Sequence, residues 1–597
     1  MKYLSELLTD EVSAAFKEAG YREEAGKVSV SNRPDLCEFQ CNGAMSLARE
    51  YHKAPIKIAE EVAQILSNSK IFSEVNAAAP GFLNMKLSGD YLKDYLACMT
   101  APDYGLKKES SEKIIMDYGG PNVAKPLHIG HLRSAIIGES IKRMGKITGN
   151  EVLADIHMGD WGLQMGLIIH ELSLRKGDLC YFDPSYDGEY PEEAPFTLSE
   201  LEEIYPTASK KSKETDGEGN ETPEAKEYKE AALLATKELQ DGRRGYRALW
   251  EHIMKISVAD LKANYEKLDV SFDIWKGESD ADKYIAPMVE NMKEKGLAHE
   301  SRGALVVDIE EEDDTKEVPP CMILKSDGAA LYTTTDLGTL VQRQEDYRPD
   351  RIIYVVDKRQ GLHFEQVFRC AKKTGIIPKD TRLDFLGFGT MNGPDGGPFK
   401  TREGGVMRLE SLIKEVNEEM LKKMKESDHD LNPAEEKEAA AIVAMAAIKY
   451  GDLSNQATKD YIFDIDKFTS FEGNTGPYIL YTVVRIKSIL RKYTEQGGDI
   501  KDARLSAPKT DDEKALMNKL AMFNSMMDNA FKELAPHRVC AFIYEVANDF
   551  NRFYHSTKIL TEENETRQKG WIALLVFTKG ILETCLDVLG MKAPEKM

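Results

Sequence analysis

Residues 121–131 read Pro-Asn-Val-Ala-Lys-Pro-Leu-His-Ile-Gly-His, and this stretch decides the fold of the chain. Before it, the apolar run Lys113–Tyr118 is typical of a buried strand. After it, apolar residues between 132 and 141 recur at roughly helical spacing, and Gly149 is a suitable end for that helix. A strand, a tight turn and a helix in this order are typical of a parallel α/β sheet, whose ligands bind beyond the carboxyl ends of the strands.

The turn carries two histidines, His128 and His131, and their i, i+3 spacing places both on one side of the first helical turn. Imidazole N–H groups beside the open N-terminus of a helix favour a polyphosphate. Gly130 has no side chain, so a flat base or a ribose can approach the backbone there. For a bare His-x-x-His pattern, two ordinary histidines, one of them capping the helix, are the commoner explanation. The full eleven-residue string is far more specific.

This string resembles the HIGH signature of class I aminoacyl-tRNA synthetases. Its fuller form, P-N-x-x-K-x-x-H-x-G-H, resembles that of the arginyl-tRNA synthetases in particular. Further motifs of that family follow in the family's order, at residues 157–164, 332–337, 360–364, 399–405 and 471–478. These matches span nearly the whole chain, so chance agreement does not explain them.

The resemblance implies an ATP-dependent ligase of the cytoplasm that works in protein synthesis. Such an enzyme activates L-arginine with ATP to arginyl-adenylate and transfers the arginyl group to the 3′ end of tRNA(Arg). The resemblance also implies Mg²⁺ with the ATP, no structural zinc, no membrane association and a monomer. Arginyl enzymes generally need bound tRNA before they form the adenylate, and no feature of the sequence explains that coupling.

Composition fits a large globular protein. The chain has 597 residues, enough for three or four domains, and 42% of them are hydrophobic. We expect no signal peptide at the N-terminus, and no apolar run approaches the roughly 18 residues that span a bilayer. The eight cysteines form no C-x-x-C pair, which predicts reduced thiols rather than a zinc site.

The net charge of −22 argues at first against a nucleic-acid partner, but the charge is unevenly distributed. Residues 182–241 carry 17 acidic and 6 basic side chains, whereas residues 449–597 carry 21 of each. Screening limits the reach of charge to about 8–10 Å, so an acidic insertion does not prevent RNA binding elsewhere.

The predicted fold class is an α/β multidomain protein. We expect a small α+β N-terminal domain at 1–105 and a Rossmann-like parallel-sheet catalytic domain at 106–405, with an acidic insertion at about 182–245. A helical connector at 406–450 then leads to an all-α bundle at 451–597, which in the resembled family binds the anticodon.

Three further core strands are predicted at 151–156, 351–356 and 383–388, and Ser209–Glu221 is predicted to be an exposed loop or a partly disordered tip. By resemblance, the N-terminal domain contacts the corner of the tRNA near the D-loop, and its motif matches residues 33–40. The alternative is that this motif serves folding without any RNA contact.

Adenylation is an in-line attack of a carboxylate on the α-phosphorus of ATP, so positioning and cationic or N–H stabilisation should dominate catalysis. We predict Lys125, His128 and His131 as catalytic residues. Class I enzymes usually carry a K-M-S-K-S loop, but here the position of the second lysine is Thr401. Some arginyl enzymes share this loss, and the resemblance then gives the pyrophosphate role to Lys125. The predicted ATP-binding residues are His128, Gly130, His131, His157, Gly159, Asp160, Lys400 and Arg402.

A guanidinium offers five N–H donors in a fixed fork, so a selective pocket needs acceptors in that plane, preferably a carboxylate. Asp336 meets this need, and Tyr332 precedes it by one helical turn. The alternative for Asp336 is a helix N-cap. By resemblance, other residues also bind the amino acid, and the predicted arginine-binding set is Asp117, Asn122, Gln164, Tyr332, Asp336 and Gln360.

The stretch Ile543–Tyr554 combines aromatic and amide side chains, which suit single-stranded RNA, and Phe471–Tyr478 with Tyr481–Arg485 forms another such cluster. An aromatic helix is more often part of a core than of an RNA surface. The predicted tRNA-binding residues are Tyr481, Tyr544, Asn548, Asn551 and Tyr554.

Two other functions share parts of the pattern. A nucleotidyltransferase for a small metabolite also uses H-x-G-H, but the length of the chain and its helical C-terminal region argue against it. A noncatalytic tRNA-binding paralogue is disfavoured because Lys125, both histidines and Asp336 are intact. Cysteinyl and isoleucyl relatives would need zinc thiolates or a far larger editing insertion.

Overall fold

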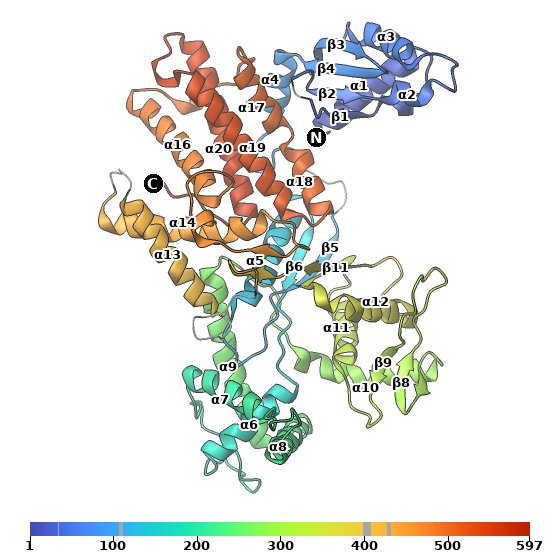
Figure 1. The fold of residues 1–597 in the computed structure, drawn as a ribbon, viewed down its shortest axis with the longest axis vertical. Coiled ribbons are helices and arrows are strands. Elements are labelled where there is room, and N and C mark those ends of the chain that lie inside the picture. Colours follow the sequence, from blue (N-terminus) through green and yellow to red (C-terminus); the bar gives the residue numbers. More distant parts are fainter. Residues whose placement is uncertain (34, 107–110, 398–406, 427–430) are drawn as a thin grey trace.

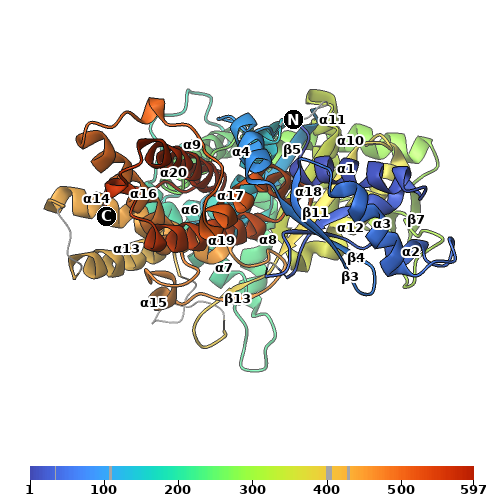
Figure 2. The ribbon, with the colours of Figure 1, turned by 90° about the horizontal axis from the view of Figure 1, so that it is seen from above.

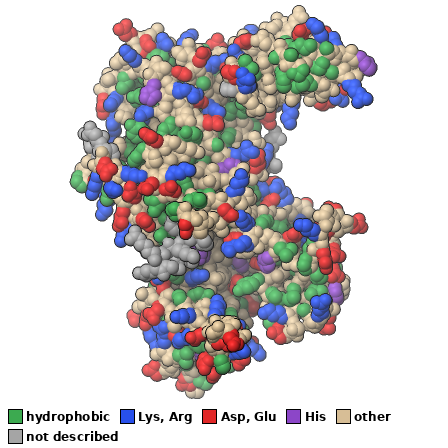
Figure 3. Space-filling model, viewed as in Figure 1, with side chains coloured by type: hydrophobic (Ala, Val, Ile, Leu, Met, Phe, Trp, Pro, Cys, Tyr) green, Lys and Arg blue, Asp and Glu red, His purple; other side chains and the backbone are tan. Residues whose placement is uncertain are grey.

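The structure is a computed structural model, and it describes residues 1–33, 35–106, 111–397, 407–426 and 431–597. A parallel sheet lies at the centre (Figure 1), with the N-terminal domain and the C-terminal helices on one side of it and the helices of the insertion on the other. In the space-filling view, the N-terminal domain and the lobe that contains α10–α12 overhang a hollow on one side of the molecule (Figure 3).

The N-terminal domain is an antiparallel sheet covered by helices, as the sequence predicts. Its strand order is β1-β2-β4-β3. In β4, alternate residues Leu83, Met85 and Leu87 are buried, which explains why this segment is a strand. The elements are α1 (Leu4–Glu18), η1 (Glu23–Gly26), β1 (Val28–Val30), β2 (Phe39–Cys41), α2 (Gly43–Leu47), α3 (Pro55–Leu66), β3 (Phe72–Ala78), β4 (Phe82–Leu87) and α4 (Gly89–Cys98).

The central sheet has the order β11-β10-β5-β6, and all its pairs are parallel. The four strands that the sequence predicts are present, and β6 ends one residue earlier than predicted. The carboxyl ends of β5 and β10 therefore meet at one edge, where the loops described below begin. The elements are β5 (Lys113–Tyr118), α5 (Ile129–Ile147), β6 (Glu151–Asp155), α6 (Leu163–Arg175), α11 (Tyr332–Asp346), β10 (Arg351–Asp357), η2 (Lys358–Gln360), α12 (Gly361–Thr374) and β11 (Arg382–Phe388).

The acidic insertion folds mainly as helices. Its helix α7 buries Leu201, Ile204 and Ala208 while its charges face solvent. The predicted exposed tip begins within α7 and continues as a turn before α8, in which the carboxylate of Asp216 accepts backbone N–H groups. The elements between β6 and β10, apart from α6 and α11, are α7 (Leu198–Lys211), α8 (Pro223–Gln240), α9 (Arg244–Lys267), α10 (Glu278–Glu294), β7 (His299–Ser301), β8 (Ala304–Val307) and β9 (Cys321–Leu324).

The C-terminal region is helical, as predicted, and it packs directly on the catalytic domain. Helix α5 contacts α13, α14, α18, α19 and α20, so one hydrophobic core joins the two regions. Seen from above, α13, α14 and α16 lie at the end of the molecule opposite to α2 and α3 of the N-terminal domain (Figure 2). Two short strands, β12 and β13, pair in parallel at the junction. The elements are β12 (Met391–Asn392), α13 (Leu409–Lys425), α14 (Pro433–Leu453), β13 (Tyr461–Ile462), α15 (Ile465–Phe468), α16 (Gly476–Glu495), η3 (Ile500–Asp502), α17 (Asp511–Ala521), α18 (Phe523–Lys532), α19 (Pro536–Ser556), η4 (Ile559–Thr561) and α20 (Glu565–Val588).

All eight cysteines have free thiols. Across the described ranges, no helix is long and apolar enough to cross a membrane.

Candidate active site

Two loops at the carboxyl ends of β5 and β6 pair with each other. Val123 donates its N–H to the Gly159 carbonyl (3.1 Å), and Gly159 donates to the Pro121 carbonyl (3.2 Å). A Cβ added to Gly159 would lie 2.1 Å from Oδ1 of Asn122, so any larger residue there would displace the Asn122 side chain. The loops thus bring together Asn122 and Gly159, which the sequence assigns to the arginine and ATP sites.

The loop that carries Lys125 is held on both sides. Ala124 has a φ of 56°, in the left-handed region, and its N–H donates to Oγ of Ser257 on α9 (3.0 Å). The side-chain amide of Gln164 donates to the Val123 carbonyl. Gln164, predicted to bind arginine, therefore supports the backbone beside Lys125, and only its amide oxygen faces away from that contact.

His128 caps α5 and also fixes His131. Its Nδ1 accepts the N–H of Gly130 (3.0 Å), and its own backbone N–H donates to Nδ1 of His131 (3.1 Å). Each Nδ1 is an acceptor, so in each neutral ring the proton lies on Nε2. A Cβ on Gly130 would lie 2.7 Å from the His128 ring. The glycine therefore makes room for that imidazole as well as for a ligand.

Both histidines are neutral at pH 7. Burial lowers the pKa of His131 to about 3, with further contributions from His128 once that ring is protonated and from the charge of Lys125. Burial and the charge of Lys125 also lower the pKa of His128. The pair therefore offers two Nε2–H donors, whereas Lys125 supplies the positive charge of this loop.

The segment after the predicted phosphate loop joins the histidine helix. Ile129 donates its N–H to the Met407 carbonyl (3.2 Å), and Leu409 donates to the Leu127 carbonyl (3.1 Å). These bonds place Met407, which follows the 399–405 motif by two residues in the sequence, beside the start of α5. Lys400 and Arg402, predicted to bind ATP, lie outside the described residues.

One face of α11 is turned toward this edge of the sheet. Tyr332, Asp336, Thr339 and Arg343 follow at i, i+4, i+7 and i+11, which is one helical stripe. Asp336 lies inside the helix, so the N-cap alternative is wrong, because that position belongs to Leu331. Tyr332 is 76% exposed.

Asp336 has a partner on the next helix. Its Oδ2 lies 2.6 Å from Nε2 of His363, on the first turn of α12. Gln360, predicted to bind arginine, is exposed one turn before His363, at the start of that helix. The contact between the two helices fixes the direction of the Asp336 carboxylate. His363 lies within the 360–364 motif but is not among the predicted site residues.

Arg343 forms the floor of the site. Its Nη2 bonds Oδ2 of Asp117 (2.5 Å) and Oδ2 of Asp155 (2.8 Å), and its Nη1 bonds the hydroxyl of Tyr354 (3.0 Å). All of these groups are buried. Asp117, predicted to bind arginine, therefore gives one oxygen to the floor, and a ligand would have to meet the other.

Glu278, which sequence analysis missed, lies at the start of α10 among the predicted site residues. Burial, with the negative charges of Asp160 and Asp336, raises its pKa to about 7 even though His157 opposes the shift. Desolvation of the Tyr332 hydroxyl raises its pKa, and the negative charge of Glu278 raises it further. Two carboxyl groups, those of Glu278 and Asp336, therefore interact beside the exposed Tyr332.

Two predicted ATP-binding residues have structural partners here. Asp160 is almost fully buried, and its carboxylate accepts both the backbone N–H (3.0 Å) and the hydroxyl (2.6 Å) of Ser279. Asp160 therefore holds the first turn of α10 and, with it, Glu278. His157 has a φ of 35°, and its Nε2 lies 3.5 Å from the hydroxyl of Thr339 on α11. The buried Nδ1 of His157 has no hydrogen-bond partner among the described residues.

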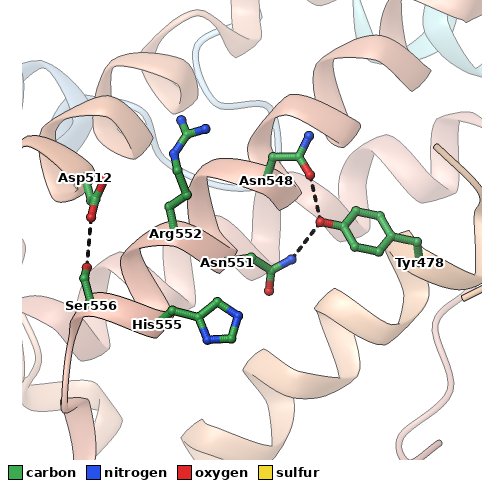
Figure 4. Close-up of a pocket in the computed structure, with 7 residues that line it drawn as sticks. All are labelled: Tyr478, Asp512, Asn548, Asn551, Arg552, His555 and Ser556. Carbon is green, nitrogen blue, oxygen red and sulfur yellow. Dashed lines mark hydrogen bonds between the residues drawn. The ribbon is translucent and has the colours of Figure 1, made fainter. Parts of the chain in front are cut away.

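The predicted tRNA-binding residues gather on α16 and α19. The hydroxyl of Tyr478, which lies in the 471–478 cluster but outside the predicted set of tRNA-binding residues, bonds Asn548 (2.7 Å) and Asn551 (2.9 Å). These three side chains line an open pocket of about 650 Å³, together with charged and polar residues of α17 and α19 (Figure 4). Tyr544 packs edge-on against Tyr478, with ring centroids 5.8 Å apart.

Next to that pocket, a cation lies between two aromatic rings. The guanidinium carbon of Arg485 is 4.7 Å from the ring centroid of Tyr481 and 5.2 Å from that of Tyr554, and its Nη1 bonds Asn551 (2.6 Å). Tyr481 is 41% exposed, whereas Phe550 is fully buried. On α19, which carries Phe550, the predicted residues Tyr544, Asn548, Asn551 and Tyr554 are partly exposed. That helix is therefore partly core and partly surface, and its predicted residues lie on the partly exposed side.

In the part of the chain that the structure describes, no three His, Cys, Asp or Glu side chains are close enough together to hold a metal ion.

Models of three protein families match this chain in succession. They are the arginyl-tRNA synthetase N-terminal domain at residues 2–87, the class I (R) tRNA synthetase catalytic domain at 97–465 and the DALR anticodon-binding domain at 479–597. The curated arginine–tRNA ligase of Agathobacter rectalis is 61% identical over the whole length of both chains. That of Alkaliphilus oremlandii is 53% identical over 99% of this chain and 100% of its own.

Solved structures agree with these matches. Arginyl-tRNA synthetase of Plasmodium falciparum superposes over the whole of both chains with a TM-score of 0.80 at 26% identity. The Thermus thermophilus arginyl-tRNA synthetase shares the fold, again over both whole chains, with a TM-score of 0.78 at 22% identity. The catalytic family model covers more than half of this chain, and close relatives align from end to end. The chain therefore belongs to the arginyl-tRNA synthetases of class I.

Proposed function

We propose that this chain is an ATP-dependent ligase that activates L-arginine to arginyl-adenylate and transfers the arginyl group to the 3′ end of tRNA(Arg). One observation carries the proposal beyond family membership. Two neutral imidazoles with Nε2–H donors stand at the start of α5, and the interacting carboxyl groups of Glu278 and Asp336 stand across the same edge of the sheet. The first pair suits a polyphosphate and the second suits a guanidinium.

The guanidinium of arginine would lie between Asp336 and Glu278, beside the ring of Tyr332. His363 holds the Asp336 carboxylate in place, and Asp160 holds the helix turn that carries Glu278. At the other end of the substrate, Asn122 and the second oxygen of Asp117 would bind the α-amino group. We assign smaller parts to Gln164, through the loop it supports, and to Gln360.

The phosphates of ATP would bind at the N-terminus of α5. His128 and His131 donate N–H bonds as charge develops on the transferred phosphoryl group, and Lys125 attracts the departing pyrophosphate. The backbone at Gly130 and Gly159, and the side chain of His157, would line the adenosine side. Asp160 would act there through the helix turn it holds, Lys400 and Arg402 would assist the phosphates, and Mg²⁺ would accompany the ATP.

The Tyr481–Arg485–Tyr554 group and the pocket around Tyr478 would contact the tRNA. Their exposed rings and amides suit unpaired bases. Tyr544 would support this surface by packing on Tyr478. The N-terminal domain would contact the tRNA corner, and we propose that the enzyme is a cytoplasmic monomer.

Charging of tRNA tests the proposal. Purified protein with ATP, Mg²⁺, tRNA(Arg) and labelled amino acids, offered one at a time, should attach arginine and no other amino acid. Attachment of a different amino acid, or of none by folded protein, would reject the proposed activity.

The pKa of Glu278 predicts a pH dependence. At pH 6 this carboxyl group is mostly protonated, whereas a guanidinium binds its ionised form more tightly. The KM for arginine should therefore fall about tenfold in total as pH rises from 6 to 8, with most of the fall below pH 7. Steady-state charging assays across that range measure it. Glu278→Gln should raise the KM and remove the slope; a variant that keeps the slope would show that another group titrates.

RNA stacking on the Arg485 group can be tested by Tyr481→Ala. Loss of one stacking ring costs about 1–3 kcal/mol, so the KM for tRNA should rise roughly 5- to 150-fold. The KM values for arginine and ATP should not change. Tyr284→Ala on α10 is the matched control, because Tyr284 also packs with a neighbouring cation, Lys283. Equal behaviour of the two variants would count against an RNA surface at Tyr481.

A further inference from the structure

One buried side chain joins the histidine helix to the segments around it. Arg133 follows His131 by two residues on α5 and is 2% exposed. Its Nε donates to Oδ2 of Asp452 on α14 (2.9 Å), and its Nη1 donates to the carbonyls of Gly389 (2.7 Å) and Lys459 (3.1 Å). The rings of two aromatic residues flank the guanidinium, and the hydroxyl of one of them, Tyr461, also donates to Asp452 (2.8 Å).

Each partner of Arg133 belongs to a different functional region. Gly389 opens the segment that runs through β12 toward the 399–405 motif. Lys459 precedes β13, which pairs with β12. Asp452 lies on the last turn of α14. Arg133 thus holds the helix of His128 and His131 against the approach to the predicted phosphate loop and against α14.

The pair of Arg133 and Asp452 makes only one of the two hydrogen bonds that its geometry offers. Nε and Nη2 point to the same side of a guanidinium, so a carboxylate can accept from both. Here Nη2 of Arg133 and Oδ1 of Asp452 are both buried, and neither has a hydrogen-bond partner among the described residues. Two unpaired buried polar atoms on facing partners are costly, and a small shift of α14 along α5 would satisfy both.

Helix α14 also reaches the proposed RNA surface. The hydroxyl of Tyr450, two residues before Asp452, lies 2.6 Å from Oδ1 of Asn474 and 2.9 Å from the carbonyl of Cys540. Asn474 immediately precedes the first turn of α16, which carries Tyr478. A movement of α16 or α19 on binding RNA would therefore displace the turn of α14 that holds Asp452.

We propose that Arg133 and Asp452 are positioning residues through which the RNA-binding helices set the place of His128 and His131. When RNA binds, α14 shifts and Nη2 of Arg133 donates a hydrogen bond to Oδ1 of Asp452. This bond fixes α5 in the position that adenylation needs. The inference rests on the proposed function, since it concerns the formation of the adenylate. Neither side chain touches a substrate in this scheme.

The test compares Arg133→Lys and Asp452→Asn with variants of a second ion pair whose arginine is buried. Arg351 and Asp384 form this pair at the opposite, amino end of the sheet, with an Nε–Oδ2 distance of 2.5 Å; Arg351 is 3% exposed, and the side chain of Asp384 is 26% exposed. Arg351→Lys and Asp384→Asn therefore report the effect of damaging an ion pair of a buried arginine far from the histidines. Rates of arginine-dependent ATP–pyrophosphate exchange are measured at saturating tRNA, per folded molecule, with thermal unfolding followed in parallel.

We expect both Arg133→Lys and Asp452→Asn to lower the exchange rate about 10- to 100-fold, as misplacement of a catalytic group does. Because they break one contact, the double variant should be no slower than either single variant. The KM for arginine should stay within about twofold, because no contact with arginine is removed.

Three results would overturn the inference. The rates could equal those of the unmodified chain, the losses could match those of the Arg351 and Asp384 variants, or the two single losses could multiply in the double variant. If the unmodified chain shows no arginine-dependent exchange at all, the proposed function itself fails, which is a different and recognisable outcome.

Discussion

Replacement of Lys125 by alanine is expected to slow formation of arginyl-adenylate about a hundredfold or more, the range seen when one charge-stabilising group is lost. Lys125 lies close enough to His128 and His131 to lower the pKa of both. Since both imidazoles are neutral, Lys125 is the cation of this loop, and Thr401 stands where other class I enzymes have a second lysine. ATP–pyrophosphate exchange with arginine and tRNA measures the effect.

The control for this prediction is Lys262→Ala on α9. Lys262 is exposed, whereas Lys125 is half-buried, and Lys262 packs over Trp275 rather than at the histidine pair. It should exchange at the normal rate, and the KM for arginine should be unchanged in both variants. Near-normal turnover by Lys125→Ala would refute the pyrophosphate role and move it toward Lys400 and Arg402.

Asp336→Asn is expected to lower kcat/KM for arginine by about two to three orders of magnitude. A buried charged group that loses its partner costs about 2–5 kcal/mol, and an amide presents one acceptor where the guanidinium fork needs two. The variant should still bind ATP, because Asp336 faces His363 and Glu278 and not the start of α5. Arginine titrations in the exchange assay, beside ATP titrations, separate the two effects.

Asp346→Asn is the matched control for Asp336, since Asp346 lies on the same helix and pairs with Lys276 outside the proposed pocket. It should leave the kinetics of arginine unchanged. Equal losses of arginine and ATP use in Asp336→Asn would show a general defect and contradict a specific contact with the guanidinium.

Local pattern was sufficient for the elements that position the site. The strands β5 and β10 are continuous apolar runs because helices or loops cover both their faces, and such runs are readable without tertiary information. The family signature then located the turn before α5. Helical spacing alone placed Tyr332 and Asp336 on one face. If the same spacing had been extended to Thr339 and Arg343, it would have identified the floor of the site as well.

Contacts between segments that are distant in the sequence could not be predicted from local pattern. Glu278 stands in sequence as an acidic residue in the first turn of a helix, a common position that needs no functional explanation. Only the packing of α10 against α11, together with the loop at Asp160, brings it to Asp336. Neighbours that are remote in sequence also direct the Gln164 side chain toward the Val123 carbonyl. They likewise determine which residues of α19 belong to the core.

The most direct test of the account is arginine-dependent ATP–pyrophosphate exchange by the purified chain, with and without tRNA(Arg). The account predicts exchange when arginine and tRNA are both present, and the coupling through Arg133 predicts little exchange with arginine alone. Exchange without tRNA would keep the ligase and remove the coupling. No exchange under either condition, from folded protein, would contradict the proposal that this site activates arginine.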